Sequence, residues 1–262
     1  MNAIPAVIAK VKKIVMVSPL FEGKINPGVI YAAYKCKIKD IYCIGGAQAI
    51  AALTYGTRSV QNVNKIVGPG NKFVTFAKKE VFGEVGIDMI AGPSEITVVA
   101  DRYSNPEWIA ADLISQAEHD KLSQSILISS NYKILKKVEN LIQKQLEFLP
   151  RKKIAKYSLI KFGLFIKSSS DTEIAQIINT IAPEHLELCI KKYNKIKNKV
   201  FNAGSIFLGE YSTEAMGDYL AGPNHVLPTT GTAKFSSGLS VYDFLKRVSY
   251  VNLSKKGVEN LG

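Results

Sequence analysis

The chain contains three histidines, and one of them ends a stretch with a possible ligand pair. Gln116 precedes His119 by three residues in the sequence DLISQAEHD, which is typical of a helix end. Side chains three apart on a helix lie on one face, so this pair could share a metal ion. The alternative is a helix C-terminal histidine that interacts favourably with the helix dipole, beside a surface glutamine. Spacing alone leaves both interpretations open.

A second histidine, His185, directly follows Glu184 in the stretch IAPEHLEL. A carboxylate there could activate water, while an imidazole with a pKa near neutrality could accept and return a proton. The competing interpretation is a helix N-terminus, with Pro183 near its first turn and Glu184 complementing the dipole. Taken alone, the local pattern favours this structural interpretation.

The third histidine, His225, lies in a loop-like stretch, MGDYLAGPNHVLP. Asp218 follows a glycine in the same stretch, and an isolated aspartate in a loop is usually a turn former. A metal site that needs several imidazoles would have to include His225, because the chain has no further histidine.

Three strand-like runs end in glycine-bearing turns, CIGGAQA, IVGPGNKF and IAGPSE. Ligands of parallel α/β sheets gather at the carboxyl ends of strands, where helix N-termini suit phosphates and other anions. GPGN before a helix could contact a dinucleotide, although neither a G-x-G-x-x-G nor a Walker A sequence is present. Such turns are also common for steric reasons alone.

Strand-like and helical stretches alternate along the chain. Strands are expected near 13–19, 40–46, 64–70, 95–101, 123–130 and 204–210, and helices near 27–37, 47–56, 71–83, 105–119, 131–150 and from 241. A strand followed by a helix is expected over 163–188. This rhythm predicts an α/β protein with largely parallel sheets. A domain boundary is expected at Gly92-Pro93-Ser94, and the stretch 226–240 is loop-like.

Composition excludes several classes of protein. Hydrophobic residues make up 47% and charged residues 21% of the 262, which are ordinary globular values, and no apolar run has the length of a membrane span. The N-terminal residues lack the order typical of a signal peptide. Cys36, Cys43 and Cys189 are few and widely spaced. They are typical of reduced, mostly buried thiols in a cytoplasmic protein.

The net charge of +12 invites a nucleic-acid interpretation. The lysines are spread over helix-like stretches, however, and are dense only at 191–199. No RNP motif, zinc-finger spacing or glycine-flanked basic loop accompanies them. The charge pattern therefore favours solvated helix faces, and we expect no nucleic-acid partner.

One enzyme family shares these motifs in this order. The chain resembles histidinol dehydrogenases in GGAQAIAAL, KIVGPGNKFVTFAKKEVFG, IDMIAGPSEITVVAD, DLISQAEHD, APEHLEL and NAGSIFLGEYSTEAMGDYLAGPNHVLPTTGTAKFSSGLSVYDFLKR. The resemblance implies two incomplete Rossmann-like domains, 1–92 contacting NAD and 93–240 with the zinc and substrate residues. Residues 241–262 would begin a helical tail. It also implies NAD-dependent oxidation of L-histidinol through the aldehyde to L-histidine, the last two steps of histidine biosynthesis.

The resemblance assigns binding roles to five positions. Zn²⁺ would be held by Gln116, His119 and Asp218, a mixed set of nitrogen and oxygen ligands. The same three residues, together with Ser94 and His185, would contact the substrate. The metal would then anchor and orient the substrate, a role distinct from activating water.

The resemblance also assigns catalytic and cofactor positions. His185 would take the hydroxyl proton as hydride leaves for NAD, and Glu184 would activate the water that attacks the aldehyde. Gln48 of GGAQ and Asn71 of GPGN would contact the cofactor. His225 would give structural support near the site.

Members of the family are longer at both ends, so the resemblance implies a truncated chain. An NAD-contacting tyrosine, and a C-terminal Glu and His, would have no counterpart here; that His would be a zinc ligand donated across a homodimer interface. Losing one ligand weakens a zinc site. The alternatives are an inactive or split remnant that serves as a binding or assembly subunit, and a basic nucleic-acid binder.

Overall fold

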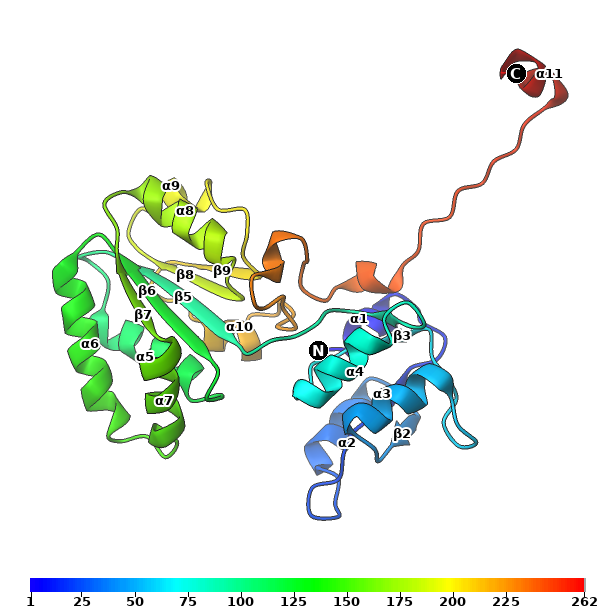
Figure 1. Ribbon diagram of the computed structural model, residues 1–262, viewed down its shortest axis with the longest axis horizontal. Helices are drawn as coiled ribbons and strands as arrows, with labels where there is room; N and C mark the ends of the chain where they lie inside the picture. Colours follow the sequence, from blue (N-terminus) through cyan, green and yellow to red (C-terminus); the bar gives the residue numbers. More distant parts are fainter. Residues whose placement is uncertain (262) are drawn as a thin grey trace.

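A five-stranded parallel sheet is the largest element of the fold (Figure 1). The computed structural model describes residues 1–261. The strands lie in the order β7-β6-β5-β8-β9. Their bounds are Leu164–Lys167, Gln124–Ser129, Glu95–Ala100, His185–Cys189 and Ser205–Leu208. The central strands β5, β6 and β8 are almost completely buried, as expected of parallel strands that are covered on both faces. The prediction of an α/β fold with parallel sheets is confirmed.

Helices cover both faces of this sheet (Figure 1). One face packs against α5 (Pro106–Ala117), α6 (Tyr132–Leu146) and α7 (Lys152–Phe162), and the other against α8 (Asp171–Ile181) and α9 (Asn194–Lys197). Burying one leucine or isoleucine in such a layer contributes about 1.5–3 kcal/mol, so the two layers hold the strands rigidly. The helix that we expect over 131–150 ends at Leu146, before Pro150, and α7 follows it as a separate helix.

Side-chain caps start most of the helices that follow strands. An Asn, Ser or Thr accepts a hydrogen bond from a backbone N–H of the first turn at Asn26, Asn71, Asn105, Asn131, Ser170 and Thr213. These residue types are the preferred N-caps, because their oxygens satisfy N–H groups that have no partner in the helix. The caps fix where each strand turns into the next helix.

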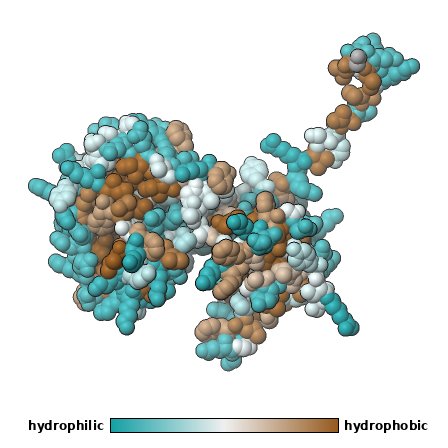
Figure 2. Space-filling view, in the orientation of Figure 1, coloured by the Kyte–Doolittle hydropathy of each residue, from teal (hydrophilic) through white to brown (hydrophobic). Residues whose placement is uncertain are grey.

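The first part of the chain has two smaller parallel sheets. In one, β1 (Val15–Val17) pairs with β2 (Asp40–Tyr42), and in the other β3 (Lys65–Ile66) pairs with β4 (Gly86–Ile87). The helices of this part are α1 (Ala3–Ile8), α2 (Pro27–Lys35), α3 (Gly46–Tyr55) and α4 (Lys72–Glu80). Its buried cluster is small, and hydrophobic side chains gather on the visible surface of this part (Figure 2).

The segment after α10 (Glu214–Tyr219) returns to the first part of the chain. Val226 and Leu239 pack against Met89, and a 3₁₀ turn, η1 (Thr232–Lys234), lies between them. The helix that we expect from 241 is only a 3₁₀ turn, η2 (Val241–Phe244). Extended chain then leads to α11 (Lys255–Leu261), away from the other elements (Figure 1). The division at 92/93 stays a prediction.

Two further expectations can be compared with the fold. All three cysteines are free thiols, but Cys43 is exposed, so the expectation of mostly buried thiols is wrong for this residue. Within residues 1–261, no helix has both the length and the apolar character that crossing a membrane requires.

Candidate active site

A cavity of about 240 Å³ lies beside the amino ends of β5 and β8. It contains every residue for which a zinc, substrate or catalytic role is expected: Ser94, Gln116, His119, Glu184, His185 and Asp218. Glu214, His225 and Thr229 also line it. Among the described residues around the cavity there is no lysine or arginine, although the chain has a net charge of +12. The cavity is therefore suited to a cation.

His185 is the first residue of β8, and only 3% of it is exposed. Its Nδ1 lies 3.1 Å from the backbone oxygen of Glu95. A carbonyl only accepts, so Nδ1 must carry the proton, and Nε2 is left as an acceptor without a partner. Burial lowers the pKa of His185 to about 4, although Asp218 opposes this effect. The imidazole is therefore neutral near pH 7 and can act as a base.

Glu184 precedes β8 and is equally buried. Its Oε2 accepts a hydrogen bond of 3.0 Å from the backbone N–H of Glu95 and lies 3.7 Å from Nδ1 of His185. Burial raises the pKa of Glu184 to about 8. The interpretation of this stretch as a helix N-terminus is wrong, because α8 ends at Ile181 and a buried strand follows.

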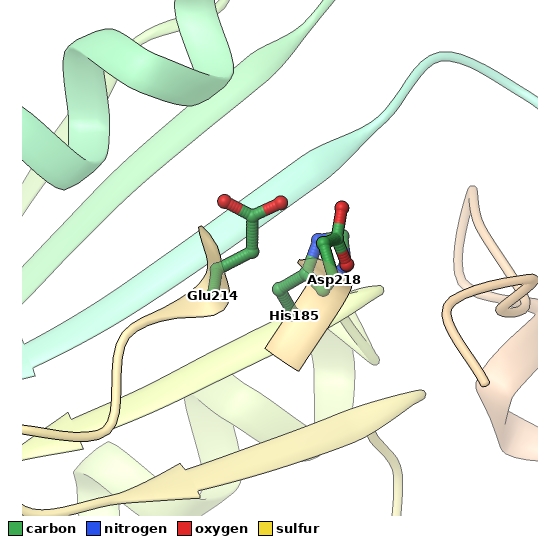
Figure 3. Close-up of side chains that lie close together, drawn as sticks. All are labelled: His185, Glu214 and Asp218. Carbon is green, nitrogen blue, oxygen red and sulfur yellow. The ribbon is translucent and has the colours of Figure 1, made fainter. Parts of the chain in front are cut away.

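The short helix α10 supplies two carboxyl groups to the cavity. Asp218 lies on this helix and not in a turn, so the turn-former interpretation is wrong. Side chains four apart on a helix are neighbours, and Glu214 therefore lies beside Asp218. One ligand atom from each of His185, Glu214 and Asp218 lies within 4.8 Å of the others (Figure 3). Glu214 was not predicted from the sequence. The E-x-x-x-D spacing that follows the cap Thr213 could have identified it.

Gln116 and His119 contact each other at the end of α5. Nε2 of Gln116 lies 3.2 Å from Nδ1 of His119. The helix ends at Ala117, so the pair is not held on one helix face; His119 follows the helix and is exposed. Gln116 is completely buried, and its Oε1 has no partner. The alternative of a surface glutamine is therefore wrong.

His225 also lines the cavity and lies against Asp218. Its Nδ1 is 3.0 Å from the backbone oxygen of Asp218 and 3.6 Å from the Oδ1 atom of the same residue. The backbone contact requires a donor, so His225 donates through Nδ1. This contact fixes the end of α10 beside the cavity.

Buried polar atoms without partners identify the point where a ligand fits. Five such side-chain atoms occur among the described residues, and three of them belong to this cavity: Gln116 Oε1, His185 Nε2 and Asp218 Oδ1. A buried polar group without a partner costs roughly 1–3 kcal/mol, so three around one cavity favour a bound group that satisfies them. The two oxygens, with an imidazole nitrogen of His119, make a mixed donor set that fits Zn²⁺, and Nε2 of His185 stays available to accept a proton.

Two further carboxyl groups lie behind the cavity. Glu187 is completely buried in β8, and its Oε1 accepts a hydrogen bond of 2.7 Å from the backbone N–H of Glu214. Burial and the neighbouring Asp112 raise the pKa of Glu187 well above its ordinary value. The contact links the start of α10 to the strand that begins with His185.

Glu187→Gln is expected to make stability less dependent on pH. Folded Glu187 keeps a proton that the unfolded chain releases above its ordinary pKa of 4.5, so the wild type loses stability as the pH rises from there. Glutamine has no such proton and can still accept from Glu214. Denaturant unfolding at about pH 5 and about pH 8 should show the variant gaining stability relative to wild type at the higher pH. An equal difference at both values would contradict this, and exposed Glu80→Gln is the matched control.

The two expected cofactor positions lie at the starts of neighbouring helices. Gln48 is exposed in the first turn of α3, and Asn71 is the N-cap of α4; the two helices pack together. The oxygen of Asn71 accepts from the backbone N–H groups of Phe73 and Val74, which leaves its amide N–H groups available. Gly45 caps α3 without a side chain, so the first N–H groups of this helix could bind a phosphate.

A family model and several known proteins match the whole chain. The family model for histidinol dehydrogenase matches residues 1–262. The chain is 60% identical over 263 residues to a histidinol dehydrogenase of Pelagibacter ubique (strain HTCC1062) and 55% identical over 262 residues to one of Bacillus cereus (strain ATCC 10987 / NRS 248). In both cases the match covers 100% of the chain and 61% of the relative.

A solved structure is similar over the same length. The crystal structure of histidinol dehydrogenase from Elizabethkingia anophelis superposes with a TM-score of 0.94 at 44% identity and covers 100% of the chain. The chain corresponds to 60% of that protein, so it spans about three-fifths of the relatives that it matches. Sequence and fold thus agree, and the chain belongs to the histidinol dehydrogenase family.

Proposed function

We propose that the chain contains the substrate and zinc site of an enzyme that oxidises L-histidinol through L-histidinaldehyde to L-histidine with NAD. One observation supports this most directly. The cavity is lined by three carboxyl groups and three imidazoles, with no lysine or arginine among its described residues, in a strongly basic chain. L-Histidinol carries an ammonium group and an imidazole, which such a cavity would attract.

His185 is the base of the first oxidation in this proposal. Its neutral ring presents the free lone pair of Nε2, while Nδ1–H is held by the backbone oxygen of Glu95. Nε2 accepts the proton of the substrate hydroxyl as hydride leaves the carbon for the nicotinamide, and the product is the aldehyde. The backbone contact stabilises the imidazolium that results.

Glu184 is the base of the hydration that follows. Its carboxylate takes a proton from water as the water oxygen bonds to the aldehyde carbon, and a hydrate forms. A second NAD would then take a hydride from the hydrate carbon while one hydroxyl loses its proton, which gives the carboxylic acid. The raised pKa of Glu184 means that the free protein must lose a proton here before the step, and a nearby cation would favour that loss.

Gln116, His119 and Asp218 would hold the zinc ion in this proposal. Zinc supplies a fixed positive charge that anchors and orients the nitrogen groups of the substrate. Gln48 and Asn71 would contact NAD through the starts of α3 and α4. We further propose that the active form is a homodimer in the cytoplasm, as the resemblance implies.

Purified protein tests this function directly. We expect NADH to form from L-histidinol and NAD in the presence of zinc, and a chelator to abolish it. Light scattering of the active sample reports the oligomeric state. A folded protein that binds L-histidinol and zinc but forms no NADH would support the inactive-subunit alternative, and one that binds neither would contradict the proposal.

Glu184→Gln is expected to separate the two oxidations. The amide cannot take a proton from water, so oxidation of the aldehyde should fall by about 10²-fold while the first oxidation is largely retained. In an active form, the wild type should yield two NADH for each L-histidinol, whereas the variant should yield close to one and accumulate aldehyde. Equal loss of both steps would contradict this division of roles. Exposed Glu80→Gln controls for the loss of one charge.

A further inference from the structure

The structure has a second and larger cavity, of about 420 Å³, at the other end of the five-stranded sheet. Much of its wall comes from residues that directly follow strands: Asp101 to Tyr103 after β5, Ser130 after β6, and Ile190 to Lys192 after β8. Lys195 and Ile196 line it from α9 (Asn194–Lys197). The start of α8 completes it with Asp171 and Ile174. It therefore opens at the carboxyl ends of the parallel strands, whereas the cavity of His185 lies at their amino ends.

The topology of the sheet explains why a cavity forms at this place. From β5 the chain continues outward through β6 and β7, and it then crosses back to build β8 and β9 on the other side. The connections that leave β5 and β8 consequently diverge to opposite faces of the sheet. In open α/β sheets, ligands bind in the crevice that such a change of direction leaves at the carboxyl ends.

The two connections are held at a fixed separation. Oδ2 of Asp101 accepts a hydrogen bond of 3.0 Å from the backbone N–H of Lys191, and its Oδ1 accepts one of 2.8 Å from Tyr103. The buried hydroxyl of Ser104 also donates to the backbone oxygen of Cys189, at the end of β8. These contacts join the two sides of the crevice. Both carboxylate oxygens of Asp101 accept hydrogen bonds from the protein itself. The crevice is thus formed before any ligand binds.

The charge of this second cavity is the reverse of the first. Arg102, Lys191, Lys192 and Lys195 line it, against Asp171 and the internally bonded Asp101. The guanidinium of Arg102 and the ammonium of Lys191 lie 4.9 Å and 5.2 Å from the ring centroid of Tyr103, which keeps both cations beside the opening.

Apolar side chains supply the other part of the wall. Val99, Ile174 and Ile190 face the cavity from the sheet and from α8. A volume of several hundred Å³ with one apolar wall and a few polar groups is typical of small-ligand sites. The cations of the lining suit a phosphate, and its apolar side chains suit a flat ring.

We propose that this cavity binds a mononucleotide, with the phosphate at Arg102, Lys191 and Lys195 and the base against the apolar wall. The site is separate from the cavity of His185 and from Gln48 and Asn71, and it does not depend on the proposed oxidation. Binding there would add a nucleotide-sensing surface to the end of the sheet opposite the candidate active site.

Calorimetric titration of the purified protein with AMP tests the proposal. We expect saturable binding that Lys191→Ala/Lys195→Ala weakens at least about tenfold, because two charges near the phosphate are lost. Lys137→Ala/Lys144→Ala removes the same charge from the exposed face of α6 and should leave the affinity unchanged. Inorganic phosphate should bind more weakly than AMP, because it lacks the ring.

Three results would overturn the proposal. These are the absence of saturable AMP binding, equal affinity of the two double variants for AMP, and binding of phosphate as tight as that of AMP. All four lysines are exposed, so the variants should keep the circular dichroism spectrum of the wild type. Since the readout is binding, failure of the oxidation reaction would leave this test intact.

Discussion

His185→Asn is expected to lower the rate of L-histidinol oxidation by roughly 10³-fold in an active form of the protein. The wild-type ring is neutral because burial lowers its pKa to about 4, and the backbone of Glu95 fixes which nitrogen carries the proton. Asparagine can still donate a hydrogen bond to that backbone oxygen. It cannot accept the hydroxyl proton, so the variant keeps the local contact and loses the base.

Measurements on the His185→Asn variant should separate catalysis from binding. We expect kcat for both oxidations to fall, while zinc content and the affinity for zinc change little, because the expected zinc ligands are other residues. Unfolding by denaturant checks that the buried strand β8 is intact. A loss below about tenfold, with the fold retained, would contradict the assignment of His185 as the base.

Two central strands of the larger sheet were predictable from the sequence, because they are largely apolar runs, whereas β8 lies in 163–188, where a strand followed by a helix was expected. The stretches EITVVA and QSILIS became β5 and β6, and their full burial explains why their pattern is so clear. The first part of the chain was less predictable in detail, since its strands have only two or three residues.

The site was less predictable, because it depends on contacts between distant residues. The backbone oxygen of Glu95, 90 positions earlier in the chain, determines which ring nitrogen of His185 carries the proton. No local sequence pattern contains that information. The burial of Gln116 could not be predicted from the sequence either, because it comes from packing around the end of α5. Glu214 was missed because a loop was expected where α10 forms. The family resemblance nevertheless identified Gln116 and His185 as site residues, although their local sequence patterns favoured structural roles.

In a parallel α/β sheet, ligands are expected at the carboxyl ends of the strands. The cavity that contains the expected zinc and catalytic residues lies instead at the amino ends of β5 and β8. The carboxyl ends have their own cavity, with basic walls. The two ends of one sheet thus present opposite charge, which favours different ligands at each.

A buried ion pair supports the wall of the candidate active site that comes from the first part of the chain. Lys78 on α4 and Asp88 are both almost completely buried and paired with each other. The pair also holds Gly68 on both sides: Lys78 donates to its backbone oxygen at 3.0 Å, and Asp88 accepts from its N–H at 2.7 Å. Gly68 has a φ of +115°, which favours glycine. Its neighbour Pro69 lines the cavity.

Lys78→Met is therefore expected to destabilise the protein by about 3–5 kcal/mol, because it leaves the carboxylate of Asp88 buried without its partner. Denaturant unfolding measures this cost, and Lys79→Met, one position along on the exposed side of α4, should change stability by less than about 0.5 kcal/mol. If the pair acts as a unit, Lys78→Met/Asp88→Asn should cost less than the sum of the two single variants. Additive costs, or a loss below about 1 kcal/mol for Lys78→Met, would show that the pair does not hold the loop at Gly68.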